Sequence, residues 1–495
     1  MTSDQGPRTI WLIAGGLLTA GAFPLGPLPT RPPVAAWPLA WVGLVPLLVA
    51  LLRAESGRLA ARAAFVFGCA WMFVDCVWLF RVFDVLGWVL IWVPIGWIVV
   101  FGLLAFRVRR LDASIWLTWP LLWIAIEFVR SEWTPLRFDL LSPQLDPLRF
   151  SWLVLGHSRV AEPVLAQTAD LWGGYGLSLA PFLCNLILAR WWVTRCFPVR
   201  AAVAVGLLVA AEVGYGAWHL NREPSGVAVP VGVVQTERER LDVLIELTEQ
   251  LLREAPGTRV VVWPEEAFAE RPGNLDAVRD LARRHGVWIG TGSEHPVGEH
   301  HENLAYWVSP AGDAGVYHKR ERVPFVELHT PAAEAPTFPL MIDGRELRVG
   351  VAICYDMDFP TTARELTSHG AQLLVVPTLD EGGWGGTQHA QHSLLPRLRA
   401  IENRRAVVQA ATSGVSQVID NRGRVLAAVP YRLHRRPRRP TLYLEGTAHA
   451  TVHAADGMSL YTRGGHLFGP AIAVLAAAVV GWAVVRPGGR RMEKN

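Results

Sequence analysis

The chain has 495 residues, of which 51% are hydrophobic and 18% are charged, and its mean hydropathy is +0.25. A chain with so few polar residues cannot cover a surface that lies wholly in water. Part of the protein must therefore face lipid. The same balance excludes intrinsic disorder, and five cysteines are too few for a disulfide scaffold. The length predicts two or three domains rather than one small binding module.

Long apolar segments fill the first 220 residues, each close to the roughly 20 residues that a helix needs to cross a bilayer. An eighth segment of this kind stands alone near the C-terminus. We therefore predict a multi-pass α-helical membrane domain with about eight spans. The predicted spans are 9–27, 36–52, 62–81, 86–106, 113–130, 163–190, 199–219 and 466–486.

Arginines gather after every second predicted span, in loops near 53–62, 107–110 and 190–200 and in the tail near 490–494. By the positive-inside rule these ends are cytoplasmic, so the N-terminus lies inside and residues 220–465 lie outside. Arg8 before an apolar run that ends near Ala20-Gly21-Ala22 also resembles a cleavable signal. We interpret this run as a retained first helix, because further spans follow it.

This pattern predicts three parts. Residues 1–220 form a membrane domain with seven spans, 221–460 form an extracytoplasmic domain, and 461–495 form the last span with a basic cytoplasmic tail. The middle part alternates short β-branched runs with amphipathic stretches, which is typical of an α/β fold. Its predicted strands are 227–234, 260–263, 287–290, 305–308, 347–353, 373–377, 406–411 and 415–419. Its predicted helices are 237–254, 273–285, 359–369 and 387–404.

Cys354 is the only cysteine in this α/β segment and has no disulfide partner there. It follows an apolar strand and precedes a turn and a helix beginning near Pro360, which is a position that suits a nucleophile. The backbone N–H groups of Tyr355 and Asp356 are candidates for stabilising charge on a bound carbonyl oxygen. A buried, inert cysteine is the alternative that Cys354 alone leaves open.

Two more strand ends carry ionisable groups. Glu265 follows the strand Val260-Val-Val-Trp-Pro, and a carboxylate there can accept the thiol proton if burial raises its pKa. We prefer it to Glu266, which the two-residue period of a strand points the other way. Lys319 is one of only two lysines among 47 basic residues, and an ammonium beside Cys354 favours thiolate and holds an oxyanion. Glu327 is positioned to orient the lysine or to act as a second carboxylate.

The order of these motifs resembles the nitrilase, or carbon-nitrogen hydrolase, superfamily over most of 226–430. The membrane half resembles the membrane region of bacterial apolipoprotein N-acyltransferases. The motifs that carry the first resemblance are Trp-Pro-Glu265, Tyr-His-Lys319, Val-Pro-Phe-Val-Glu327, Ile-Cys354-Tyr-Asp and Arg397-Leu-Arg-Ala-Ile-Glu-Asn-Arg-Arg. Those that carry the second are Glu127-Phe-Val-Arg130, Trp152-Leu-Val-Leu-Gly156-His-Ser158 and Gly174-Tyr-Gly-Leu-Ser178.

The resemblance implies a nitrilase-like α/β/β/α sandwich outside the membrane and a Glu-Lys-Cys triad. In that triad Cys354 is the nucleophile, Glu265 the general base and acid, and Lys319 the oxyanion stabiliser. It also implies four auxiliary residues, which are Glu327, Tyr355, Asp356 and Trp384. Asp356 stands where the family usually has Glu, and residues 378–386 depart from the family's usual loop.

The implied reaction is a ping-pong acyl transfer in a bacterial plasma (inner) membrane, with the catalytic domain on the periplasmic side. A membrane phospholipid is the acyl donor, the acyl group passes through a thioester on Cys354, and the acceptor is the N-terminal amine of a diacylglyceryl-cysteine lipoprotein. We expect no cofactor and no nucleic-acid partner. The alternatives are a membrane-anchored amidase, in which water resolves the thioester, and a non-catalytic membrane scaffold.

The histidines do not predict a metal site. His300 and His301 are adjacent on a predicted strand and point apart, and no carboxylate or cysteine completes a set around His389 and His392. We expect these side chains to be solvated or hydrogen-bonded.

Overall fold

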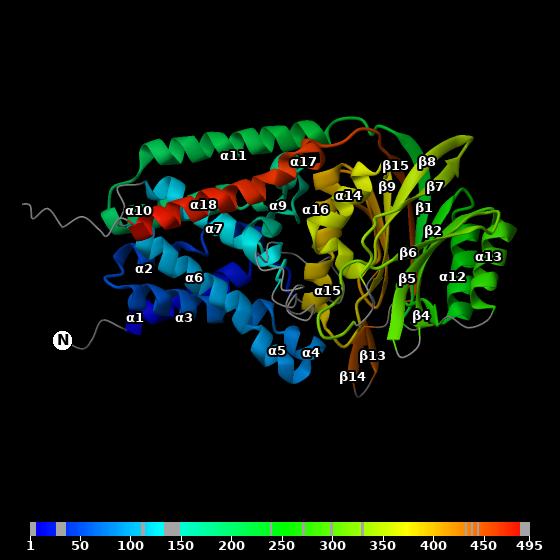
Figure 1. Ribbon diagram of the computed structural model, residues 1–495, viewed down its shortest axis with the longest axis horizontal. Coiled ribbons are helices and arrows are strands. Elements are labelled where there is room, and N and C mark those ends of the chain that lie inside the picture. Colours follow the sequence, from blue (N-terminus) through cyan, green and yellow to red (C-terminus); the bar gives the residue numbers. More distant parts are fainter. Residues whose placement is uncertain are drawn as a thin grey trace, which may run out of the picture.

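The computed structural model describes residues 6–25, 36–109, 114–132, 149–237, 240–269, 273–297, 300–327, 331–430, 433–436, 439–442 and 445–485. Within these ranges the chain forms a helical half and an α/β half, which lie end to end along the long axis of the molecule (Figure 1). The α/β half is inserted between helix α11 (Val199–Leu220) and the last helix, α18 (Phe468–Val485). Both of these helices run along one side of the helical half (Figure 1).

The helical half buries an aromatic core, in which Trp71, Phe101, Trp123 and Phe182 are among the packed rings. The returning helix α18 packs on α7, where Gly469 lies against Phe128. The other helices of this half are α1 (Gly6–Ala20), η1 (Trp37–Trp41), α2 (Val45–Arg53), α3 (Gly57–Asp75), α4 (Leu79–Val82), α5 (Asp84–Leu90), α6 (Trp92–Val108), α7 (Ile115–Ser131), η4 (Leu155–Arg159), α8 (Pro163–Ala166), α9 (Ala169–Gly176) and α10 (Leu179–Thr194).

Four helical stretches among the described residues are long and apolar enough to cross a membrane, or five if the bent pair α9 and α10 forms one span. The prediction of one continuous helix over 163–190 is wrong, because this run is divided among α8, α9 and α10 with a bend of 51° between the last two. Gly173, at φ +76°, interrupts the helical backbone there. Hydropathy does not predict such a break within an apolar run, because it depends on side-chain type and not on backbone conformation. The predicted basic tail after the last helix lies outside the described residues.

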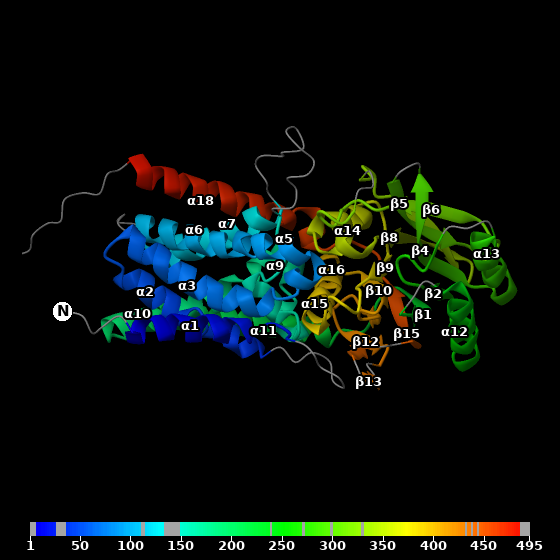
Figure 2. The same ribbon diagram turned by 90° about the horizontal axis from the view of Figure 1, so that it is seen from below.

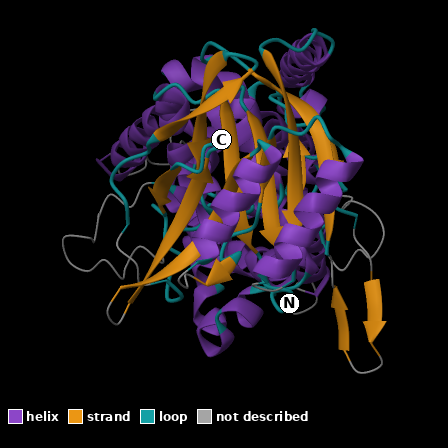
Figure 3. Ribbon diagram, turned by 90° about the vertical axis from the view of Figure 1, so that its right-hand side faces the viewer, coloured by secondary structure: helices purple, strands orange, loops and turns teal. Residues whose placement is uncertain are grey.

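The α/β half contains two sheets packed face to face (Figure 3). The first has the order β15-β1-β2-β4-β5-β6, with β3 pairing to β4, and the second has the order β12-β11-β10-β9-β8-β7. The strands of the first sheet are β1 (Val227–Gln235), β2 (Val260–Val262), β3 (Phe268–Ala269), β4 (Trp288–Val297), β5 (His300–Val308), β6 (Ala314–His318) and β15 (Gly446–Ala454). Those of the second are β7 (Thr337–Ile342), β8 (Arg345–Val351), β9 (Leu373–Leu379), β10 (Ala406–Thr412), β11 (Gln417–Ile419) and β12 (Val425–Ala428).

Helices cover both outer faces of this sandwich, which makes the layers α/β/β/α. Helices α12 (Leu241–Glu254) and α13 (Asn274–His285) cover the first sheet on the far end of the molecule. Helices α14 (Pro360–Ser368), α15 (Gly386–His392) and α16 (Leu394–Asn403) lie between the second sheet and the helical half (Figure 2). Short helix α17 (Leu460–Arg463) and the 3-10 turn η6 (Gly465–Leu467) lead into α18. The sandwich fold expected from the sequence is therefore present.

The sheets hold more strands than the apolar runs predicted. Strands β6, β7 and β15 were not expected, and buried positions are interleaved with more exposed ones along each of them. The predicted helix 387–404 is broken at Ser393 into α15 and α16. A small hairpin of β13 (Leu433–Arg436) and β14 (Arg439–Leu442) stands apart from both sheets.

Candidate active site

Three strand ends meet at one edge of the sandwich. Glu265 follows β2, Lys319 follows β6, and Cys354 follows β8 at the start of the turn η5 (Cys354–Met357). All three side chains are buried. Strands β2 and β6 run in the same direction in the first sheet, and the packing of the second sheet brings the end of β8 to the same edge.

A compact ion-pair cluster forms at this edge. Lys319 Nζ lies 2.7 Å from Glu265 Oε1 and 2.6 Å from Glu327 Oε1. Asn303 Nδ2 donates to the same two oxygens, at 2.7 and 2.9 Å. The cluster therefore places two carboxylates on one ammonium, and the amide of Asn303 fixes the spacing between them.

The end of β9 connects the general-base candidate to the thiol. The backbone N–H of Leu379 donates to Glu265 Oε2 at 2.8 Å, and the Cys354 thiol donates to the Leu379 carbonyl at 3.5 Å. Gly292 on β4 permits close packing of the Glu265 backbone, because a Cβ at this glycine would lie 2.6 Å from Glu265 Cα.

Cys354 adopts a left-handed backbone conformation, with φ +44°. Such a conformation costs a non-glycine residue free energy and persists only where surrounding contacts enforce it. Asp356 supplies those contacts. Its Oδ2 accepts hydrogen bonds from the Ile353 amide at 2.8 Å and the Tyr317 hydroxyl at 2.7 Å. Its Oδ1 accepts from the backbone amides of Arg320 and Glu321 at 3.1 and 2.7 Å.

Asp356 thus ties the turn of the thiol to the segment that carries Lys319. Burial raises the pKa of Asp356 to about 6, although its hydrogen bonds oppose this rise. One expectation for this turn is wrong, because the Asp356 amide donates to the Ile353 carbonyl at 2.9 Å and is not directed at a substrate oxygen.

The cluster's charges set the protonation of the resting site. Burial alone would lower the pKa of Lys319, but the carboxylates of Glu265 and Glu327 raise it well above its usual value. Burial and the nearby Glu265 carboxylate raise the pKa of the Cys354 thiol well above its usual value, although Lys319 opposes them. At neutral pH the site therefore holds an ammonium and a neutral thiol, and the thiol needs a base before it can attack.

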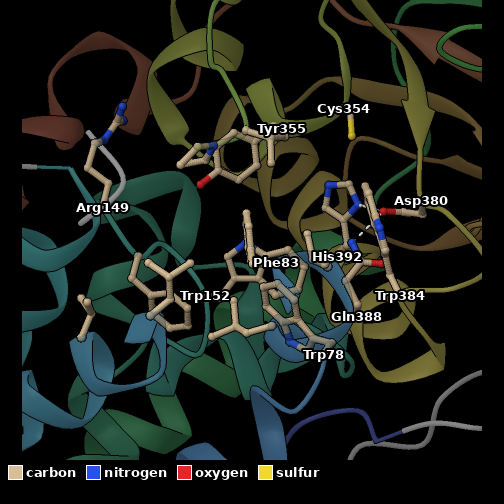
Figure 4. A pocket seen from close by; sticks show the side chains of 17 residues that line it. Trp78, Phe83, Arg149, Trp152, Cys354, Tyr355, Asp380, Trp384, Gln388 and His392 are labelled. Atoms are coloured by element: carbon tan, nitrogen blue, oxygen red, sulfur yellow. Dashed lines mark hydrogen bonds and ion pairs between the residues drawn. The ribbon is translucent and has the colours of Figure 1, made fainter. Parts of the chain in front are cut away.

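Two cavities open onto Cys354. The first, here called the polar cavity, has a volume of about 260 Å³ and contains the ion-pair cluster. The second, here called the apolar cavity, is narrower, about 80 Å³, and takes most of its walls from the helical half. Among its lining residues are Trp78, Leu79, Val82, Phe83, Leu90, Val93 and Trp152 (Figure 4).

The remaining predicted residues line these cavities. Tyr355 lies in the apolar cavity, with its ring edge-on to Phe359 at 5.2 Å between centroids. Trp384 lines both cavities. Glu266 was expected to point away, but it lines the polar cavity with Glu265. The two-residue period does not apply to it, because β2 ends at Val262 and the two glutamates occupy a turn.

Sequence analysis missed Asn303, whose position within a strand gives no signal of function. It also missed the surroundings of His392, which is buried between the carboxylates of Asp358 and Asp380. Nothing in the sequence indicated these two carboxylates, because both come from other elements, and His392 is hydrogen-bonded, as expected. Within the described ranges no group of three or more His, Cys, Asp or Glu side chains is arranged to hold a metal ion.

The carbon-nitrogen hydrolase family model matches residues 230–432. This match and the α/β/β/α sandwich assign the α/β half to the nitrilase-like proteins, as the motifs indicated. A crystal structure of Nit3 from Saccharomyces cerevisiae, described as a member of the nitrilase superfamily, aligns with 46% of this chain and 90% of that chain, with 20% identity and a TM-score of 0.37.

The helical half matches the model of the apolipoprotein N-acyltransferase N-terminal domain over residues 15–187. The chain is 28% identical to the apolipoprotein N-acyltransferase of Geobacter metallireducens, over 98% of this chain and 97% of that protein. It is also 28% identical to that of Gloeobacter violaceus, over 94% of this chain and 93% of that protein. The chain belongs to the apolipoprotein N-acyltransferase family, and it is a membrane protein with several candidate spans.

Proposed function

We propose that the chain transfers an acyl group from a membrane phospholipid to the N-terminal amine of diacylglyceryl-cysteine in lipoproteins. The observation that carries this proposal is the position of Cys354, where the polar and apolar cavities meet beside the ion pair of Lys319 and Glu265. An acyl chain suits the apolar cavity and a polar, amine-bearing acceptor suits the other. A long chain would extend from the narrow cavity past α4 and α5 into the bilayer.

In the first half-reaction, the Glu265 carboxylate takes the thiol proton and the Cys354 sulfur attacks the ester carbonyl carbon. Negative charge then develops on the carbonyl oxygen, and the Lys319 ammonium stabilises it. As the intermediate collapses, the carbon–oxygen bond of the ester breaks, and the lysophospholipid alkoxide takes the proton from Glu265. A thioester remains on Cys354.

In the second half-reaction, the neutral amine of the acceptor attacks the thioester carbonyl carbon and Glu265 takes the proton that the amine loses. Collapse of this intermediate breaks the carbon–sulfur bond, and Glu265 returns the proton to the sulfur. The product is an amide, and the enzyme returns to its starting state. Glu327 and Asn303 hold Lys319 and Glu265 at fixed distances through both steps.

The proposal extends to topology and domains. We infer eight spans and an α/β domain over 221–460 on the extracytoplasmic side, between a membrane domain at 1–220 and a last span with its tail at 461–495. The support is the apolar run at each predicted span and the arginines after every second one. This arrangement brings one site within reach of two substrates that both reside in a bilayer.

The test is intact mass spectrometry of the purified protein after incubation with phospholipid and no acceptor, beside the variant Cys354→Ser. We expect an acyl-sized adduct on the parent protein that hydroxylamine removes, and no such hydroxylamine-labile adduct on the variant. A synthetic diacylglyceryl-cysteine peptide added next should gain the mass of the acyl chain. An unmodified peptide with steady release of free fatty acid would instead identify a hydrolase, and the absence of any adduct would reject the thioester.

A further inference from the structure

A buried histidine links the nucleophile turn to the end of β9. His392, the last residue of α15, places Nδ1 2.8 Å from Asp380 Oδ1 and Nε2 3.2 Å from Asp358 Oδ1. The three residues are each no more than 2% exposed. Figure 4 shows the imidazole of His392 beside the Asp380 carboxylate, at the wall of the apolar cavity.

Both ring nitrogens of His392 face carboxylate oxygens. A neutral imidazole can donate to only one of these carboxylates and carries no charge, whereas an imidazolium donates from Nδ1 to Asp380 and attracts the Asp358 carboxylate as an ion pair, 3.2 Å from Nε2. Burial alone would lower the pKa of His392, but Asp380 and Asp358 raise it well above its usual value. The neighbouring His389 differs, because its Nε2 contacts the Glu381 carbonyl at 3.0 Å and burial lowers its pKa.

Other groups hold this arrangement in place. Trp152, from the segment before η4, donates its indole N–H to Asp358 and stacks on the imidazole, with 5.7 Å between centroids and 17° between planes. Gln388 donates to Asp380 Oδ1 at 2.7 Å. His392 therefore has a fixed orientation, and one of the groups that fix it belongs to the helical half.

Asp380 and Asp358 each lie close in sequence to a residue of the proposed reaction or to a residue that contacts one. Asp380 directly follows Leu379, whose carbonyl accepts from the Cys354 thiol and whose amide donates to Glu265. Asp358 directly follows η5, the turn that begins with Cys354. The negative charge of Asp380 also acts on the thiol, whose pKa it raises. An imidazolium on Asp380 opposes that effect and connects the two segments.

We propose that His392 is a positioning residue for Cys354, holding the nucleophile turn against the end of β9 and offsetting the negative charge of Asp380 beside the thiol. The inference rests on the proposed function, in which Cys354 is the nucleophile. It requires no contact between His392 and a substrate. Its consequence is that the charge at His392, and not only its shape, sets how readily the thiol ionises.

The experiment measures the rate at which iodoacetamide alkylates Cys354 in the full-length protein in detergent, as a function of pH. Peptide mass spectrometry separates Cys354 from the other four cysteines. His392→Gln keeps a donor for Asp380 but removes the positive charge. We expect the midpoint of its alkylation profile to move to higher pH, with alkylation about tenfold slower below the midpoint for a shift of about one pH unit.

Two further variants separate charge from shape. Asp358→Asn removes a negative charge while His392 stays paired with Asp380, so its midpoint should move to lower pH. His389→Gln is the matched control on the same helix, and its midpoint should match the parent protein. Loosened packing would not shift the alkylation midpoint in a direction that depends on the charge removed. Opposite shifts for His392→Gln and Asp358→Asn would therefore indicate an effect of charge.

An unchanged midpoint in His392→Gln, or shifts of both variants in the same direction, would overturn the proposal. If His392→Gln does not fold, judged by gel filtration and thermal unfolding, the direction of the Asp358→Asn shift decides alone. Alkylation uses no lipid, so this result is independent of the acyl-adduct assay. If the two variants show opposite shifts but the protein forms no acyl adduct, the inference about His392 stands and the proposed function is rejected.

Discussion

The two cavities at Cys354 are built in different ways. The polar cavity is made by loops of the α/β half, and its main side chains are held by hydrogen bonds and ion pairs. The apolar cavity joins the two halves, and side chains of α4, α5 and α6 and their junctions form one part of its wall. From this difference we propose that the capacity for bond making belongs to one half, while the choice of acyl donor depends on the other. Changes in the polar cavity should stop the reaction, and changes in the apolar cavity should alter which lipid enters.

The largest expected effect is the loss of Lys319. Lys319→Met removes the proposed oxyanion stabiliser, and we expect thioester formation to slow by about 10²–10³-fold or more. Single-turnover kinetics with phospholipid measure this rate. Lys319→Arg should not rescue it, because the ammonium lies within 2.7 Å of two carboxylates in a space that a planar guanidinium does not fit. Recovery in that variant would contradict the assigned role, and thermal unfolding of both variants controls for the two carboxylates left unpaired.

A large effect on stability is expected at Asp356. Asp356→Asn replaces one of its two acceptor oxygens by a donor, so at least one of the three backbone N–H groups that now donate to it loses its partner. Each buried donor left unpaired costs about 1–3 kcal/mol. Thermal unfolding at pH 7 should show a clearly lower midpoint than for Asp343→Asn, a matched change at an exposed turn. Equal midpoints would show that the four hydrogen bonds do not stabilise the turn.

A smaller effect is expected in the apolar cavity. Phe83→Ala removes part of the wall that the helical half supplies, and we expect KM for long-chain phospholipid to rise about tenfold, in line with the loss of one buried aromatic contact. The rate of Cys354 alkylation should stay unchanged. Val85→Ala, at a side chain 81% exposed, is the control. A fall in kcat with KM unchanged would show that Phe83 acts in the chemical step. The apolar cavity would then not differ from the polar cavity in its role.

The smallest effect concerns the junction of the two halves. Glu402 accepts a hydrogen bond from the Gly174 amide at 2.8 Å, and burial raises its pKa to about 7 from 4.5. The folded state then binds a proton more tightly than the unfolded state, so this carboxyl stabilises the fold fully below pH 4.5 and loses that contribution as pH rises toward 7. Glu402→Gln should flatten the pH dependence of thermal unfolding over this window. The exposed change Glu346→Gln should not.

The sequence was sufficient for the α/β/β/α sandwich and for the meeting of Glu265, Lys319 and Cys354, because Glu265 and Cys354 follow apolar strands and Lys319 stands in a motif that resembles the nitrilase superfamily. It was insufficient for Asn303 and for the His392 cluster, whose members come from four separate segments and meet only after both halves pack. The Asp356 departure also has its reason in the structure, since the shorter carboxylate accepts four hydrogen bonds, one from its own turn and three from residues 317–321. Helix breaks at Gly173 and Ser393 depend on backbone geometry that hydropathy does not encode.

The pairing of β1 with β15 has a consequence for the order of assembly during synthesis. The two strands pair antiparallel from Val227 with Ala454 to Gln235 with Gly446, so the first strand of the domain waits for the last one to leave the ribosome. Contacts between residues so distant in sequence form slowly, because a long loop must close before they are made. The unpaired edge of β1 stays open to chaperones or to wrong partners during that interval. The sheet is therefore completed only shortly before α18, a candidate span, is made.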